Sequence, residues 1–186
     1  MDEIDPDQQE IMRLIGPDLP RIFPIFPTAV SLYNSEVSAM ARAEHDDTAA
    51  AKATHCHVWA GFQREFLDEP GYTFLDVRGL RVLNIGDQIL IRAKKVDANG
   101  RHRNADTAQQ RAFDAQEDLP GLPAAAARIV IGYQPDIAFS EVERVIVRRP
   151  NGRWVSQIVE ADQAPYWIDI TPRELPLESG RRTTGG

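Results

Sequence analysis

The chain has 186 residues, of which 42% are apolar and 26% are charged, and its formal net charge is −7. This length suits one sizeable hydrophobic core, and the single cysteine, Cys56, excludes a disulfide scaffold. No apolar run of about eighteen residues occurs and residues 1–10 lack the basic start of a signal peptide, so we expect a cytoplasmic protein without a membrane partner.

The charge is unevenly distributed along the chain. Residues 1–70 hold 13 acidic and 5 basic side chains, whereas residues 71–128 hold 7 acidic and 9 basic ones. Because affinity for a polyphosphate backbone scales with the number of phosphates neutralised, an acidic chain needs a concentrated basic patch to bind one. Such a patch is present, and its members are candidates for binding phosphate or an acidic partner: Arg92, Lys94, Lys95, Arg101 and Arg103.

The first third of the chain has helical periodicity with one interruption. Residues 6–15 are predicted to form a short helix. The four prolines within residues 17–27 predict an extended segment that lies against the domain. Two further helices are predicted at residues 28–40 and 49–67, with Cys56 packed in the core on the apolar side of the second one.

After residue 71 the hydrophobic period changes from about 3.6 to about 2, which predicts β-strands. A long irregular connection, with a short helix at residues 107–116, divides the strands into two groups. Helices first and hairpins afterwards predict an α+β fold, with N-terminal helices packed on one face of a mainly antiparallel β-sheet. The strands are expected at residues 72–77, 81–85, 88–96, 128–133, 142–148 and 154–159.

In the third strand, alternate residues face opposite sides of the predicted sheet. Ile89, Ile91 and Ala93 face one side, and Arg92 and Lys94 face the other. Two interpretations of the basic side stay open. The charges either guard an exposed edge strand against unwanted pairing, or form a contact surface for phosphate or an acidic protein.

The sequence also predicts how the chain is divided. Residues 1–48 are expected to form an N-terminal helical and extended segment, and residues 49–170 an α+β core domain. Residues 171–186 have the composition of a flexible tail.

Metal and nucleophile chemistry find little support in the sequence. His55, Cys56 and His57 are adjacent, but on a helix the two histidines point about 200° apart and cannot share one ion. There is no paired ligand motif for zinc, no nucleophile elbow and no phosphate-binding glycine loop. We therefore predict no metal, no cofactor and no catalytic residue.

One alternative function uses the basic strand. Asp76 on one strand and Lys94 on a later one resemble part of a restriction-type nuclease core, which holds a divalent cation between two acids. The second acid belongs two residues before the lysine, where this chain has Arg92, which would repel the cation. The alternative is therefore a nucleic-acid-binding or degenerate metal-dependent nuclease-like effector.

Three segments together resemble a poorly characterised bacterial and prophage family. Residues 90–97 match its "L-x-R-x-K-K-x-D" strand, residues 107–123 match its "T-x-Q … F-x-x-Q … L-P-G-L-P" segment, and Gly132-Tyr133 lies in the apolar strand that follows. The resemblance covers about residues 55–160. One departure is Ala93, where the family pattern has an aromatic residue.

The resemblance implies a partner encoded nearby. Genes of that family lie beside one for a helix-turn-helix regulator fused to a zinc peptidase, in toxin–antitoxin-like or phage-defence modules. Our leading hypothesis is a non-enzymatic interaction protein that binds such a partner. Residues 119–123 either pack on their own sheet or present leucines to the partner. The candidate interface residues are Gln110, Phe113, Gln116, Leu119 and Leu122.

Overall fold

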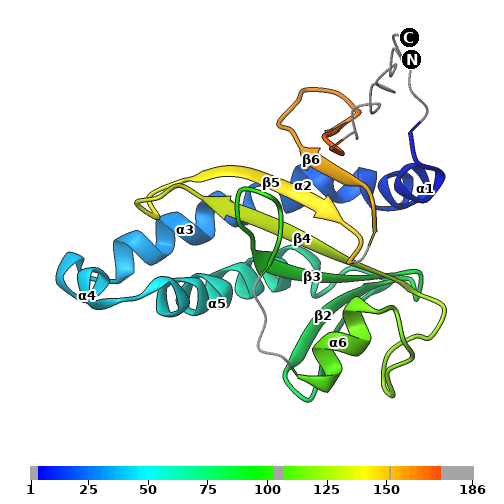
Figure 1. Ribbon diagram of the computed structural model, residues 1–186, viewed down its shortest axis with the longest axis horizontal. Coiled ribbons are helices and arrows are strands. Elements are labelled where there is room, and N and C mark those ends of the chain that lie inside the picture. Colours follow the sequence, from blue (N-terminus) through cyan, green and yellow to red (C-terminus); the bar gives the residue numbers. More distant parts are fainter. Residues whose placement is uncertain (1–3, 103–106, 151, 173–186) are drawn as a thin grey trace, which may run out of the picture.

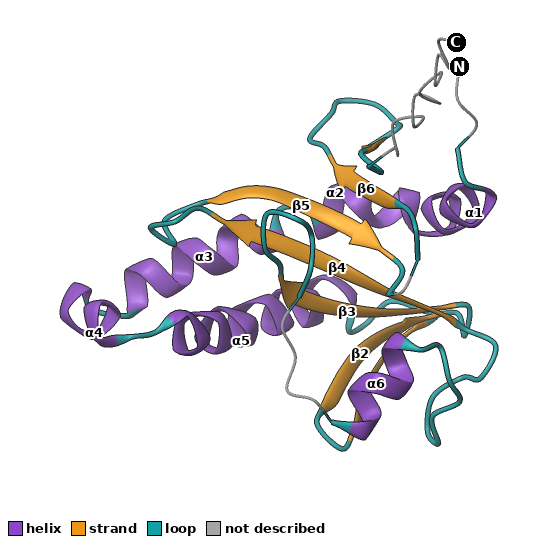
Figure 2. Ribbon diagram, viewed as in Figure 1, coloured by secondary structure: helices purple, strands orange, loops and turns teal. Residues whose placement is uncertain are grey.

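The computed structural model describes residues 4–102, 107–150 and 152–172. Long helices cover one face of a single sheet and a short helix covers part of the other, so the predicted α+β fold is confirmed (Figures 1 and 2). The helices are α1 (Pro6–Ile15), α2 (Leu19–Ile22), α3 (Ile25–Glu36), α4 (Ala39–Glu44), α5 (Asp47–Phe66) and α6 (Ala108–Asp114). The strands are β1 (Tyr72–Val77), β2 (Leu80–Ile85), β3 (Ile89–Lys95), β4 (Ala127–Pro135), β5 (Val142–Arg148), β6 (Val155–Ile158) and β7 (Trp167–Asp169).

The strands follow one another across the sheet in chain order, from β1 to β7. All neighbouring pairs are antiparallel except β3 and β4, which are parallel. A parallel pair needs a crossover connection, and the long segment between these strands supplies it and carries α6. β3 is paired on both sides at residues 89–91, but from Arg92 onward it is paired with β4 alone, so the interpretation of Arg92 and Lys94 as charges that protect an edge strand stays a prediction.

The extended segment predicted at residues 17–27 is also wrong, because these residues are helical. The prolines lie where a helix starts: Pro17 in the 3₁₀ turn Gly16–Asp18, Pro20 at the second residue of α2, and Pro24 as the N-cap of α3. The first-turn amides of a helix have no intrahelical acceptor, so a proline there sacrifices no hydrogen bond. The chain therefore turns in short helical pieces over the sheet.

Two hydrophobic clusters lie on opposite faces of the sheet. The larger one joins α1, α2, α3 and α5 to strands β2 to β6, and the smaller one lies between α6 and strands β1 to β3. Cys56 is exposed, so its predicted place in the core is wrong. The buried side of α5 is set by larger apolar residues at helical spacing, including Val58, Phe62 and Phe66. In the part of the chain that the structure describes, none of the helices combines the length and the apolar character needed to cross a membrane.

Helix α1 is held to the far strands of the sheet by polar contacts as well as by packing. The side-chain amide of Gln8, which is buried, donates to Ser156 Oγ at 2.9 Å and to Asp169 Oδ1 at 3.0 Å. The indole Nε1 of Trp154 donates to Asp7 Oδ2 at 2.8 Å. The N-terminal helices thus share one core with the strands, while the tail predicted from residue 171 lies, from residue 173 onward, outside the described residues.

The Gln8 contacts give a test of this docking. We expect Gln8→Ala to lower the free energy of unfolding by about 2 kcal/mol, because it removes two hydrogen bonds and leaves the buried hydroxyl of Ser156 without this donor. Gln9→Ala, on the exposed side of the same helix, should change it by less than about 0.5 kcal/mol. Urea denaturation measures both. Equal effects of the two substitutions would contradict the contacts described.

Candidate functional site

The predicted basic residues of β3 lie where the sheet opens. The ladder between β2 and β3 pairs only residues 83–85 with 89–91, and Figure 1 shows β2 bending away from β3 toward α6. From Arg92 onward β3 is paired with β4 alone. Side chains from α5, β2, β3 and α6 meet in this region.

Arg92 is buried, with 7% of its surface exposed. Its guanidinium donates to Gln110 Oε1 and lies 5.2 Å from the ring centroid of Phe113, both on α6. Burial lowers the pKa of Arg92 to about 10, and the nearby carboxylate of Asp114 partly opposes this change. Arg92, Gln110 and Phe113 therefore hold α6 on the sheet, and a partner could reach them only if α6 moved away.

Lys94 lies two residues further along the same side of β3 and is only partly buried. Its ammonium makes no hydrogen bond or ion pair with any residue that the structure describes. Burial and, to a smaller extent, the positive charge of Arg92 lower the pKa of Lys94 to about 8, and Asp114 acts in the opposite direction. Lys94 is thus a cation that forms no direct ion pair with the described residues, although the charge of Asp114 acts on it.

Two more basic groups surround Lys94. Burial lowers the pKa of His55 on α5 to about 4, and the charges of Lys94, Arg81 and Arg92 contribute. His55 is therefore neutral at physiological pH. Arg81 of β2 lies over the ring of Trp59, 6.0 Å from its centroid. We call His55, Arg81, Arg92 and Lys94 the basic cluster.

Asp114, at the end of α6, is an acid whose charge acts on both Arg92 and Lys94 of the basic cluster. Burial acts to raise the pKa of its carboxyl, but hydrogen bonds from His102 and Gln110 and the charge of Arg92 lower it overall. The His102 Nε2 lies 3.5 Å from Asp114 Oδ2, and Gln110 Nε2 donates to Asp114 Oδ1 at 2.9 Å. Asp114 therefore already binds neighbours on its own helix and on the connection.

The other predicted basic residues are scattered. Lys95 lies on the opposite side of the sheet, where its Nζ is 3.3 Å from Asp47 Oδ2 and 5.2 Å from the ring centroid of Phe139. Arg101 is exposed, in the turn that follows β3. Arg103 lies outside the described residues. The sequence patch is thus not one continuous surface.

The remaining interface candidates pack inside the molecule. Leu119 and Leu122 join Phe113 in the smaller hydrophobic cluster, so the self-packing interpretation of residues 119–123 is confirmed. The side chain of Gln116 donates to the carbonyl of Arg128 at 3.1 Å and accepts from its amide at 3.0 Å. Gln116 therefore takes the place of a neighbouring strand at the start of β4. None of these three residues offers a partner an apolar surface in this conformation.

The geometry does not gather the acids that nuclease chemistry needs. Asp76 Oδ1 accepts from the amide of Gly79 at 2.8 Å, and Asp76 Oδ2 lies 3.5 Å from Arg81 Nε. This carboxylate therefore stabilises the turn between β1 and β2. Across residues 4–102, 107–150 and 152–172, no group of three or more His, Cys, Asp or Glu side chains is placed to hold a metal ion.

Sequence reasoning placed Arg92 and Lys94 at the site but missed three of its members. His55 was considered only as a metal ligand and rejected, and Arg81 and Asp114 had no assigned role. Each comes from a different element, α5, β2 or α6, and no local pattern indicates that these elements meet. The spacing of Gln110 and Asp114, four residues apart on one predicted helix, is the one signal that could have identified the acid.

Comparisons with known proteins assign no function to this site. No family model, no curated protein and no solved structure matches the chain.

The state of Lys94 can be measured by chemical labelling, because only the neutral amine is nucleophilic. Labelling with acetic anhydride, followed by mass spectrometry of peptides, should show a midpoint for Lys94 at about pH 8 in the folded protein. The midpoint is lowered because burial and the positive charge of Arg92 both disfavour the charged ammonium form of Lys94. In denaturant the midpoint for the same residue should rise to about 10.4. The same midpoint in both states would contradict the environment described for Lys94.

Proposed function

We propose that this chain is a non-enzymatic interaction protein that recognises an acidic segment of a protein partner at Lys94. One observation carries the proposal. Lys94 holds a positive charge at a partly buried position, beside Arg92, and forms no direct ion pair or hydrogen bond with the described residues.

An arriving carboxylate would relieve the unfavourable environment of Lys94. It would supply a direct ion-pair partner and form a charge-assisted hydrogen bond with the ammonium, which is stronger than a bond between neutral groups. The walls of the site are fixed beforehand, because Arg92 is already held by Gln110 and Phe113. Preorganisation of this kind lowers the cost of binding.

The charge of the whole chain favours a protein partner over a nucleic acid. The net charge is −7, and residues 1–70 alone are strongly acidic. A nucleic acid would meet this repulsion along its whole length, whereas a short acidic segment would meet only the basic cluster. The role of the basic cluster would be to orient the partner and to fix its register.

The sequence resemblance suggests which partner to test. We propose the helix-turn-helix regulator with a zinc peptidase domain that is encoded beside members of the similar bacterial and prophage family. In this proposal the two proteins form a toxin–antitoxin-like or phage-defence pair in the cytoplasm. Either protein could then restrain the other.

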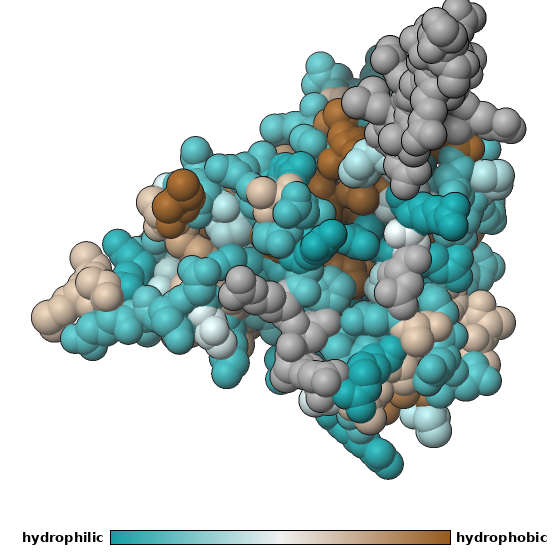
Figure 3. All heavy atoms as spheres, in the orientation of Figure 1, coloured by the Kyte–Doolittle hydropathy of each residue, from teal (hydrophilic) through white to brown (hydrophobic). Residues whose placement is uncertain are grey.

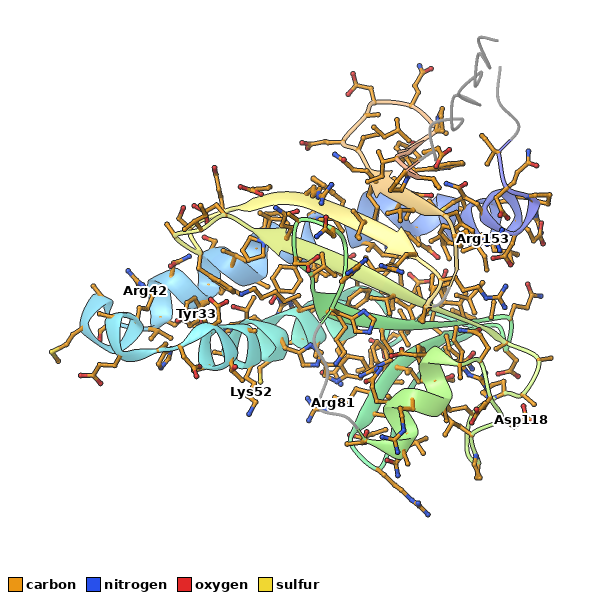
Figure 4. The ribbon with its side chains drawn as sticks, viewed as in Figure 1. Tyr33, Arg42, Lys52, Arg81, Asp118 and Arg153 are labelled. Carbon is orange, nitrogen blue, oxygen red and sulfur yellow. The ribbon has the colours of Figure 1, made fainter. Side chains whose placement is uncertain are left out.

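A pull-down with the product of the adjacent gene tests the proposal. Lys94→Met should weaken capture roughly tenfold, since it removes one charged hydrogen bond while keeping the length of the side chain. Lys52→Met is the matched control, because Lys52 is exposed and points outward from the neighbouring helix α5 (Figure 4). This control should bind like the unchanged protein. A variant at Arg92 would be less informative, because its loss would also release α6.

Three outcomes would count against the proposal. The first is no capture of the adjacent gene product, and the second is equal capture by the Lys94→Met and unchanged proteins. The third is retention on a DNA column at moderate salt, with a steep loss as salt rises. This last result would support the nucleic-acid-binding alternative at the same cluster.

A further inference from the structure

A second basic site lies on the other half of the sheet, over β5 and β6. A pocket of about 340 Å³ opens there, between the turn at residues 97–101 and the segment that follows β7. Its apolar lining includes Ile146, Val155 and Ile170, and its rim includes Arg101 and Arg144. Figure 3 shows an apolar strip over β5 and β6, framed by hydrophilic residues, on the face turned to the viewer.

The walls of this pocket are built from fixed backbone. On one side, Arg148 Nη1 donates to the carbonyl of Gly100 at 2.9 Å, and Arg144 donates to the carbonyl of Ala98. The turn also lies directly on Ile146, because a Cβ added to Gly100 would come within 2.8 Å of Ile146 Cδ1. On the other side, the amide of Ile170 donates to the carbonyl of Val155 at 2.9 Å.

Among the described residues, the arginines around the pocket form no ion pair with an acid, although the charges of Asp114 and Asp97 act on Arg148. Arg144 and Arg148 use their guanidinium groups on carbonyl and amide oxygens, which carry no formal charge. The Nε of Arg148 is buried and unpaired. The guanidinium of Arg101 is exposed and has no hydrogen bond or ion pair with any described residue. The pocket thus combines an apolar floor with a positively charged rim.

We propose that this pocket binds a small organic acid, a carboxylate carried on a short apolar chain. Arg101 is the cation that is free to bind the carboxylate in the two-point geometry typical of guanidinium groups. Ile146, Val155 and Ile170 would contact the apolar part. The volume lies at the lower end of the range for small-molecule sites, roughly 300 to 1,000 Å³, which favours a ligand with few atoms. This site is separate from Lys94 and does not depend on the partner proposed above.

Octanoate is the probe that tests the site, with NMR spectra of the full ¹⁵N-labelled chain as the readout. We expect octanoate to shift the amides of Ile146, Val155 and Ile170, and Arg101→Gln to weaken its affinity roughly tenfold. Arg153→Gln is the matched control, because Arg153 is an exposed arginine on the β5–β6 connection (Figure 4) that does not line the pocket. Its affinity should equal that of the unchanged protein.

A neutral probe and an inorganic probe test separately the contribution of the carboxylate and that of the apolar chain. Octanamide should bind much more weakly than octanoate, and inorganic phosphate should not shift the apolar floor. Val155→Phe, which fills the pocket without changing its charge, should also weaken octanoate binding. No shift with octanoate at millimolar concentration would overturn the proposal. It would also fail if the Arg101→Gln and unchanged proteins bound equally, or if phosphate bound as well as octanoate.

Discussion

The parallel pairing of β3 with β4 is the constraint on which the rest of this structure depends. Two parallel strands cannot be joined by a tight turn, so about thirty residues must leave the end of β3, pass over the sheet and return to the start of β4. That excursion carries α6 and residues 119–126 onto the second face, where they bury the smaller hydrophobic cluster. It also begins with the turn at residues 97–101, which lies on β5. Both proposed sites are therefore consequences of one connection.

Much of the fold can be predicted from local sequence patterns. The wrong predictions arise where a local pattern does not show which other segments pack against it. Alternation along residues 72–95 predicted three strands within one or two residues of their observed bounds, and the first helix has the predicted bounds. Strand β7 was missed because three residues are too few to show a period. The prolines of residues 17–27 were taken as helix breakers, although each stands within the first turn of a helical piece, where a proline is tolerated.

The difference between local pattern and tertiary contact also applies to β3, the strand that carries Arg92 and Lys94. The sequence shows correctly that Arg92 and Lys94 share one side of β3, since alternation alone determines this. It does not show that β3 is an interior strand, that β2 separates from it after Ile91, or that Gln110, eighteen residues later, accepts from Arg92. These facts depend on tertiary pairing, so one patch of charges in the sequence becomes four described environments. Arg92 is a buried anchor, Lys94 is a cation without a direct ion pair, Lys95 pairs with Asp47 on the opposite side of the sheet, and Arg101 is exposed.

The basic side chains differ in role because the nearby carboxylates already accept hydrogen bonds from other residues. Asp114 stands close enough to raise the pKa of both Arg92 and Lys94, yet its two oxygens face His102 and Gln110. Asp97 uses one carboxylate oxygen to accept the amides of Asn99 and Arg101, which shapes the turn beside the pocket. In both places a nearby carboxylate stabilises the crossover itself. The basic groups that the crossover brings together therefore keep a positive potential toward solvent, and that potential is the property by which each site would select an anionic group.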